Sequence, residues 1–434
     1  MNTKQTEAGE IPEDWEVVKL GDLLKPSIRK ESLSSNEYVS FIGMQDVSEN
    51  AELINQNPML FSDVKKGLTS FIRNDVLVAK ITPCFENGKG CYTENLKTEV
   101  GVGSTEFHVL RANDLADGKF VYFWTVQQSF REILTQEMVG SAGHKRVPFS
   151  SIQKFQIPLP SLPEQTAIAA ILSDTNRLLT TLRALIGKKR AVKTAAMQQL
   201  LSGRLRLPEF ATNGSLKNSE LGEIPEDWEV VSYGDIFQFL STSTNPRSDL
   251  TANGELLYLH YGDIHTKLST HLNITEISLP RISAKLVSSA IVKDGDVIMA
   301  DASEDYDGIG KSVEVCNIGA EKMVSGLHTF LLRDTDKRLA DGYRGFLHCI
   351  PSVKRQFNAL ATGLKVYGVS KGNLKTVLLP LPPKPEQTAI AQTLSDMDSE
   401  ITALEARAAK LAQIKQGLMQ NLLTGKIRVN TGAA

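Results

Sequence analysis

An internal duplication is the feature that most constrains how this chain can fold. The segment GEIPEDWEVV at Gly9–Val18 recurs without change at Gly222–Val231. A second segment, PEQTAIA, occurs at 163–169 and 385–391, and each copy leads to a similar ending, LLSGR at 200–204 and LLTGK at 422–426. The offset between the copies of this second repeat stays at 222 residues, so no insertion interrupts it. Two copies with so long a period exclude a solenoid and predict two similar domains about a pseudo-twofold axis.

Each PEQTAIA segment is predicted to open a long helix. Pro163 and Pro385 suit the first helical turn, the glutamate after each complements the helix dipole, and Gly203 and Gly425 suit a C-terminal stop. Each helix would span about 39 residues, roughly 58 Å at 1.5 Å per residue. Apolar residues recur at alternating spacings of four and three, which is a heptad pattern. The expected seam of the first helix is Ile168, Leu172, Leu179, Leu182, Ile186 and Leu200, and that of the second is Ile390, Leu394, Met397, Ile401, Leu404, Leu411, Leu418 and Leu422.

A narrow apolar stripe on so long a helix needs a partner. We expect the partner to be the other helix, in an antiparallel two-helix rod; the alternative is that each helix docks on its own domain. Polar residues interrupt the seams at Thr175, Lys189, Lys193 and Lys415. Leu178, Leu185 and Val192 are expected to widen the first stripe.

The segments between the repeats read as mixed α/β domains. Asp75–Lys80 and Asp296–Asp301 are predicted to be equivalent buried strands, each followed by a polar loop with glycines, and Tyr38–Ser48 is matched with Tyr258–Thr266. The predicted organisation is a repeat motif (1–20), a first domain (21–157), a central long helix (158–207), a linker with the second motif (208–233), a second domain (234–380), a C-terminal long helix (381–428) and a tail (429–434). The short motifs and the long helices repeat, whereas the sequences of the two domains between them diverge.

Composition excludes several classes of protein. The mean hydropathy is −0.16 and no apolar run approaches the ~18 residues of a transmembrane helix. The first residues carry no secretory signal, and the four cysteines form no CxxC pair, which favours a cytoplasmic location and neither a disulfide scaffold nor a zinc site. The net charge of −2 excludes a globally basic nucleic-acid binder but not a basic surface. Between 163 and 210, eight basic residues stand against three acidic ones, on either a solvated or a phosphate-facing helix surface.

Motifs for catalysis are missing from the sequence. We find no P-loop, no complete GxGxxG unit, no Asn-Pro-Pro-aromatic tetrapeptide, no HExxH and no GxSxG. His260, Asp263 and His265 cluster, but neighbouring positions of this kind are a weak metal site, and no metal is expected. The pattern favours a binding protein.

Candidate contact residues are basic, amide, hydroxyl or aromatic groups in the loops of the two variable segments, although ordinary solvation explains many such residues. In the first segment they are Lys80, Thr82, Asn87, Lys89, Ser104, Thr105, Ser141, His144, Lys145 and Arg146. In the second they are His260, Tyr261, Ser303, Lys311, Ser325, His328, Lys365, Tyr367, Ser370 and Lys371. Gly143–Lys145 and Gly363–Lys365 are interpreted as paired loops where the backbone approaches a ligand.

The order of motif, variable domain and long helix, taken twice, resembles the specificity subunit of type I restriction–modification systems. The two GEIPEDWEVV copies and the two PEQTAIA leads into helices ending LLSGRLR and LLTGKIR carry the resemblance, which covers essentially the whole chain. It implies that each variable segment is a target recognition domain reading one half of a bipartite DNA site, and that the helices set the gap. It implies no catalytic residue in this chain.

The resemblance also implies the partners. Two modification subunits would supply S-adenosylmethionine and methylate adenine, and two restriction subunits could add cleavage with ATP and Mg. Trp15 and Trp228 are expected to anchor each motif to the opposite end of the rod, or to be ordinary core residues, and Arg204, Arg206, Lys426 and Arg428 to contact partner subunits or DNA. The alternatives are a protein-binding adaptor on a coiled-coil spacer, an enzyme with a site near His260, and a subunit serving modification only.

Overall fold

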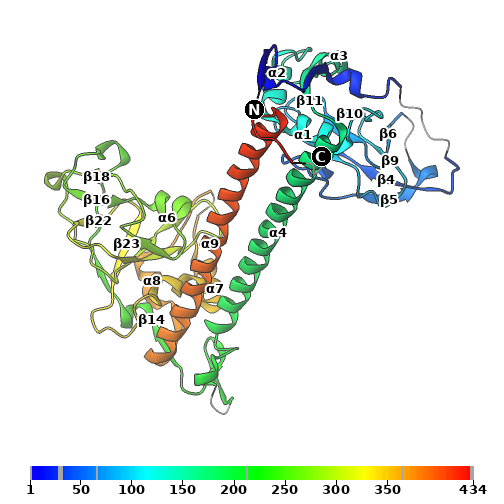
Figure 1. Cartoon of the computed structure of the whole chain (residues 1–434). Helices are drawn as coiled ribbons and strands as arrows, with labels where there is room; N and C mark the ends of the chain where they lie inside the picture. Colours follow the sequence, from blue (N-terminus) through cyan, green and yellow to red (C-terminus); the bar gives the residue numbers. More distant parts are fainter. Residues whose placement is uncertain (1, 28–32, 65–66, 212–213, 364, 431–434) are drawn as a thin grey trace. The chain divides into compact units, whose positions relative to one another are not determined.

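The chain divides into two compact units that share its two long helices. The computed structural model describes residues 2–27, 33–64, 67–211, 214–363 and 365–430. The first unit comprises residues 1–183 and 406–434, and the second comprises 184–405. Figure 1 shows the strands of each unit and the long helices α4 (Leu162–Leu200) and α9 (Lys384–Leu423). Of the described residues, none belongs to a helix both long and apolar enough to cross a membrane.

Two small sheets form the variable domain of the first unit. One has the order β5-β4-β9-β6, and the other the order β10-β7-β8. The strands are β4 (Tyr38–Ile42), β5 (Asn57–Leu60), β6 (Thr69–Ile72), β7 (Val76–Ala79), β8 (Gly90–Tyr92), β9 (Val100–Gly103) and β10 (Phe107–Leu110). They are followed by α1 (Gly118–Val126), α2 (Gln128–Gln136) and α3 (Phe149–Lys154). All four residues of β7 are buried, as the apolar run VLVA requires of a central strand.

The second unit repeats this plan with a five-stranded sheet around its central strand in place of the three-stranded one. Its sheets have the orders β18-β16-β22 and β15-β23-β19-β21-β17. The strands are β15 (Gln238–Leu240), β16 (Leu256–Leu259), β17 (His271–Asn273), β18 (Arg281–Ile282), β19 (Val297–Ala300), β21 (Ser312–Cys316), β22 (Met323–Ser325) and β23 (Thr329–Arg333). The helices are α5 (Tyr233–Ile236), α6 (Tyr261–Lys267), α7 (Pro351–Leu360) and α8 (Lys371–Thr376), and the short strands β20 (Ala302–Ser303) and β24 (Tyr367–Gly368) pair with each other.

The strand registers confirm that the two domains are equivalent. β4 runs parallel to β9 and β16 runs parallel to β22, while β7 and β19 are the buried central strands that the sequence predicts. Ile42 pairs with Gly103 and Leu259 pairs with Ser325, so Ile42 and Leu259 occupy the same position. Residues 38–48 therefore correspond to residues 255–265, which confirms the sequence-based match of Tyr38–Ser48 with Tyr258–Thr266 except for its first three positions.

Each repeated motif builds the same local structure. The hairpin β1 (Thr3–Thr6) with β2 (Gly9–Pro12) recurs as β12 (Leu216–Ser219) with β13 (Gly222–Pro225). The next strand, β3 (Glu16–Lys19) or β14 (Glu229–Ser232), pairs with β11 (Gln156–Leu159) or β25 (Leu378–Leu381). The proline-rich segments that lead into the long helices are thus strands held by the repeated motif.

Within each unit, α4 and α9 pack antiparallel along the predicted seam. Lys415 of α9 bonds Asn176 of α4 in the first unit, and in the second unit Lys189 and Lys193 pair with Glu400 and Asp398. All predicted seam residues of α4 are buried, and those of α9 are buried or half-buried. The lysines that interrupt the heptads therefore make cross-helix hydrogen bonds and ion pairs that select this register, whereas Thr175 bonds the carbonyl of Ile171 within α4. Lys189, Lys193 and Arg190, which pairs with Glu405, face carboxylates rather than phosphate.

One part of the helix prediction is wrong. Leu178, Leu185 and Val192 do not widen the seam but are exposed by 50%, 39% and 56%. They lie on the side of α4 turned away from α9, because a two-helix seam covers only a narrow arc of each helix.

A clasp of the same four residue types closes each end of the helix pair. In the second unit, the Arg206 guanidinium, just beyond α4, makes paired bonds to Glu386 at the start of α9 (2.8 and 2.6 Å) and to Asp227 of the repeated motif (2.9 and 2.8 Å). The Trp228 indole nitrogen donates to Glu386 Oε2 at 2.9 Å. Fully buried Trp228 therefore ties the motif to the helix start.

The first unit repeats the clasp with residues from both ends of the chain. Arg428, just beyond α9, binds Glu164 at the start of α4 and Asp14, and Trp15 Nε1 donates to Glu164 Oε2 at 3.2 Å. The prediction that the tryptophans anchor the motifs at the helix ends is confirmed. The expectation that Arg206 and Arg428 contact a partner or DNA is wrong, because both guanidinium groups are occupied by carboxylates, whereas Arg204 and Lys426 are exposed.

Candidate nucleic-acid interface

Three loop segments of the first domain meet at the end of β7. The loop after β7 begins at Lys80, whose backbone nitrogen donates to Glu106 O (2.9 Å) in the turn before β10. Thr82 N donates to Lys145 O (3.0 Å), and Val147 N donates to Lys80 O (2.9 Å). The third segment is a hairpin loop closed by two bonds between Val139 and Arg146. Residues 80–82, 104–106 and 139–146 therefore form one surface from separate parts of the sequence.

The side chains of this surface are basic and exposed. His144, Lys145 and Arg146 are exposed in the hairpin loop. Arg146 makes a two-bond contact with Glu106, with Nε–Oε2 at 3.0 Å and Nη2–Oε1 at 2.8 Å. The guanidinium lowers the pKa of the Glu106 carboxyl below its ordinary value. The ion pair holds Arg146 in a fixed orientation, since a bidentate fork constrains both groups.

The second domain brings together the equivalent segments with the same backbone bonds. Asp301 N donates to His328 O (3.1 Å), and Val369 N donates to Asp301 O (3.0 Å). Its hairpin loop is closed by two bonds between Thr362 and Gly368. The predicted pairing of the loops around Gly143 and Gly363 is confirmed, but the glycine equivalent to Gly363 is Gly140. Gly140 has a φ of +127° and Gly363 has a φ of +136°, and a Cβ at either position would point at the opposite backbone of its loop.

Aromatic rings gather on this second surface. The ring of Tyr261 lies 4.4 Å from that of His260 and 5.4 Å from that of His328, measured between centroids. The ring of Tyr367 lies 4.2 Å from that of Tyr306. Burial and the Arg247 charge lower the pKa of His260, while burial raises the pKa of Asp301 against the opposing effect of His328.

Equivalent positions of the two surfaces carry chemically different side chains. Lys80 corresponds to Asp301 and Glu106 to His328, since each pair makes the same backbone bond. His328 Nδ1 lies 3.3 Å from Asp301 Oδ1. A common backbone with different side chains at equivalent positions is the arrangement expected where one scaffold reads two different ligands.

Some predicted contact residues do not join these surfaces. Asn87 bonds Glu49, and the Lys89 amine donates to the carbonyl of Met44. Ser325 is buried against Thr329, and Ser370 caps α8. Lys371 lies over the Phe239 ring, and Lys311 donates to the carbonyl of His265. Ser104, Thr105, Ser141, Ser303 and Lys365 lie within the converging segments.

Sequence reasoning missed several charged residues of the second surface. Arg247 and Lys267 both approach Asp263, at 3.6 and 2.9 Å. Asp263 was considered with His260 and His265 as a metal site, but His265 Nε2 is bonded to Ala302 O and Asp263 to cations. Lys267 stands one helical turn after Asp263, a spacing that could have indicated the pair, whereas nothing local links Arg247 to it.

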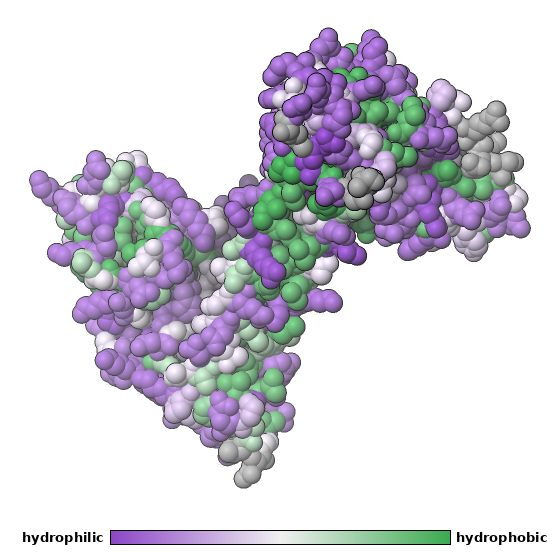
Figure 2. Space-filling model, viewed as in Figure 1, coloured by the Kyte–Doolittle hydropathy of each residue, from purple (hydrophilic) through white to green (hydrophobic). Residues whose placement is uncertain are grey.

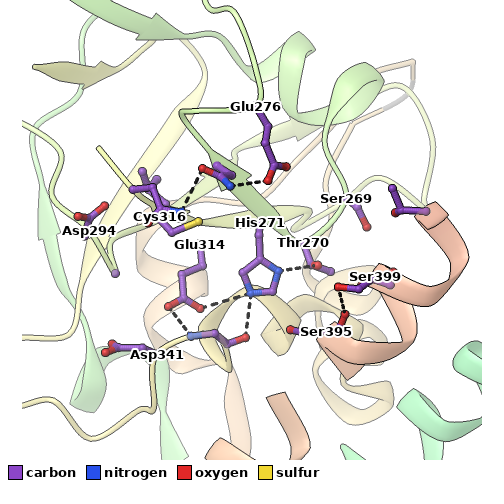
Figure 3. A pocket seen from close by; sticks show the side chains of 17 residues that line it. Ser269, Thr270, His271, Glu276, Asp294, Glu314, Cys316, Asp341, Ser395 and Ser399 are labelled. Atoms are coloured by element: carbon purple, nitrogen blue, oxygen red, sulfur yellow. Dashed lines mark hydrogen bonds and ion pairs between the residues drawn. The ribbon is translucent and has the colours of Figure 1, made fainter. Parts of the chain in front are cut away.

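Two equivalent hollows lie elsewhere and differ in charge. In the second unit, a groove of about 760 Å³ between β17, β21 and α9 is lined by Glu276, Asp294, Glu314, Asp341 and Asp398, with no lysine or arginine among its described lining residues (Figure 3). Its counterpart in the first unit, about 770 Å³, carries Lys119 and Arg177 beside its acids. An acidic groove repels phosphate, so the converging loops are the better candidate for DNA. Figure 2 shows hydrophilic residues over much of the visible face of both units.

The duplicated domains, shared long helices and paired polar loop surfaces define a two-domain binding protein with one polar loop surface on each domain. The family model for the type I restriction modification DNA specificity domain matches residues 12–189 and 225–416. These matches cover more than half of the chain, which therefore belongs to this family.

Two curated relatives show how far the sequence similarity extends along the chain. It is 26% identical over 445 residues to the putative type I restriction enzyme MjaX specificity subunit of Methanocaldococcus jannaschii, covering 99% of this chain and 97% of that protein. It is 31% identical over 226 residues to the EcoAI specificity subunit of Escherichia coli, covering 51% of this chain and 36% of that protein.

Solved structures share the fold. The type I restriction–modification S subunit from M. genitalium is 15% identical with a TM-score of 0.53, covering 98% of this chain and 99% of that one. A chain from a study of complex assembly and conformational transition of the type I R-M system is 16% identical with a TM-score of 0.57, covering 96% and 99%. At this identity the likeness concerns the fold.

Proposed function

We propose that the chain is the DNA-specificity subunit of a type I restriction–modification complex. Each recognition domain reads one half of a bipartite, asymmetric site through its converging loops. The observation that carries the proposal is the pair of loop surfaces with identical backbone bonds and different side chains, in a chain of this family.

The physics of the two surfaces supports direct reading of base edges. Exposed Lys145 and Arg146 in one domain, and Arg247 with Tyr261 and Tyr367 in the other, supply hydrogen-bond donors and stacking surfaces. Helices α4 and α9, which contribute to both units, would set the gap between the half-sites.

Catalysis is assigned to other subunits. Two modification subunits would dock on the repeated framework, bind S-adenosylmethionine and methylate adenine, and restriction subunits using ATP and Mg could add cleavage. Family membership favours this function over a protein-binding adaptor and over an enzyme with a site near His260.

Mapping methylated adenine at base resolution, with the gene intact and deleted, tests the proposal. We expect one gapped motif to lose methylation on deletion. An unchanged methylome in cells that express the chain together with its modification subunit would refute it.

A further inference from the structure

A buried carboxylate holds two exposed cations beside the second recognition surface. The side chain of Asp263, in α6, is 2% exposed. Its Oδ1 lies 2.9 Å from Lys267 Nζ and 3.6 Å from Arg247 Nη2, and its Oδ2 has no hydrogen-bond partner among the described residues. The side chains of Lys267 and Arg247 are 53% and 55% exposed. A buried charge needs compensation, so Asp263 constrains where both cations stand.

Arg247 is fixed along one side only. Its Nη2 lies 3.4 Å from His260 Nδ1, and a side chain at Gly262 would approach the same nitrogen at 3.0 Å. His260 Nδ1 already accepts a bond from Gly262 N at 3.1 Å. Nε and Nη1 of Arg247 make no bond to any described residue, and Nη2 carries two hydrogens, of which one faces His260 and Asp263. The second Nη2 hydrogen and the N–H beside it form a two-donor edge of the planar guanidinium that stays open.

The segment that carries Arg247 is anchored to the recognition surface. Ser243 N donates to Ser325 O at 2.8 Å, and the Tyr258 hydroxyl donates to Asn245 O at 2.6 Å. The same hydroxyl accepts from Leu327 N at 2.8 Å, directly before His328. Arg247 is therefore presented by a backbone bonded to the turn that bears His328.

The first domain shows that the framework does not need these cations. Asp46 occupies the position of Asp263, four residues after Ile42 as Asp263 is four residues after Leu259. Its carboxylate accepts from Gly43 N (2.7 Å), Gln45 Nε2 (3.2 Å) and Asn55 Nδ2 (3.1 Å), all neutral groups. Replacing neutral donors by cations in one domain alone points to ligand recognition rather than to folding.

We propose that Arg247 reads a guanine in the half-site of the second domain, with Asp263 as its positioning residue and Lys267 as a phosphate contact. This inference rests on the proposed function. A guanidinium fork with two open donors matches O6 and N7 of guanine in the major groove, and such a pair typically discriminates against other bases by roughly 5- to 150-fold. Lys267 has a single point charge and carries no base information.

The test uses the complete complex in cells carrying the native gene or a variant. Adenine methylation is mapped at base resolution for Arg247→Ala, Arg247→Lys, Asp263→Asn and Lys267→Ala. We expect both Arg247 variants to relax one guanine position of one half-site, while the other half-site and the gap stay unchanged. Asp263→Asn relaxes the same position less. Lys267→Ala, the matched control on the same carboxylate, lowers methylation evenly across sequences.

Three results would overturn the inference. The first is a methylated motif in which the half-site read by the second domain contains no G·C pair. The second is an Arg247→Lys complex that keeps full discrimination for guanine. The third is a loss of methylation in the Arg247 variants that is the same for all sequences. If Arg247→Ala abolishes methylation, Arg247→Lys decides. An unchanged methylome on gene deletion refutes the proposed function itself, whereas a motif that depends on the gene but not on Arg247 refutes only this assignment.

Discussion

Removal of Arg206 tests the energetics of the clasp in the second unit. The side chain of Glu386 is 1% exposed, and Arg206, itself 12% exposed, supplies two of its bonds. In Arg206→Met, Glu386 keeps only the bond from Trp228 and becomes a buried charge without a counter-ion. Breaking a buried pair on one side typically costs 3–5 kcal/mol, and because Arg206 reaches solvent we expect about 3 kcal/mol.

The neighbouring carboxylate provides the matched comparison. Asp227 is 46% exposed and bonds the same guanidinium. Asp227→Asn should therefore cost below about 1 kcal/mol, as exposed pairs do. The difference between these two variants measures burial rather than the mere presence of an ion pair.

Hydrogen exchange followed by mass spectrometry can resolve the two units. The opening free energy of peptides covering 222–232 and 384–394 should fall in Arg206→Met, while peptides covering 9–19 and 162–172 remain unchanged. The mirror variant Arg428→Met should show the reverse, because Arg428 pairs with Glu164 in the first unit. A loss below about 1 kcal/mol in Arg206→Met, or one equal to that of Asp227→Asn, would refute the reasoning.

Three further predictions concern pH, backbone and helix length. Burial lowers the pKa of His348 from 6.5 to about 3, so below pH 6.5 the unfolded chain binds a proton that the native state does not. The free energy of unfolding should therefore fall by roughly 1 kcal/mol for each pH unit below 6.5. Urea titrations at several pH values should show that this free energy falls less steeply with pH in His348→Gln. Gly425 has a φ of +74°, and a Cβ at this position would clash with the Pro12 ring. Gly425→Ala should therefore lower the stability of the first unit by about 1–3 kcal/mol in the same exchange measurement. Gly187→Ala is the control, because a Cβ at Gly187 would meet no atom within 4 Å and should not lower stability. One heptad inserted into both long helices should lengthen the gap of the methylated motif by about 3 base pairs while keeping both half-sites; an unchanged gap would contradict the role given to the helices.

The prediction from sequence succeeded where the determinants are local or repeated. The PEQTAIA repeat and the heptad spacing of residues such as Leu172 and Leu394 predict the long helices, and the identical motifs predict that Trp15 and Trp228 play the same part. The spacing of apolar residues indicates which side of a helix is buried without any knowledge of the tertiary fold. It failed for Leu178 and Leu185, because the width of a seam depends on the partner helix.

The sequence by itself thus determined the duplication, the long helices and the anchoring role of the motifs. Only the tertiary structure decided which loops meet. Lys80, Glu106 and Lys145 come together because β7 pairs with β10, with Ala79 opposite Phe107, and the hairpin loop closes on the end of β7. Arg247 meets Asp263 because the Tyr258 hydroxyl and the backbone of Ser325 hold the segment that carries Arg247. Contacts of this kind depend on strand register and loop closure, which leave no periodic trace in the residues that make them.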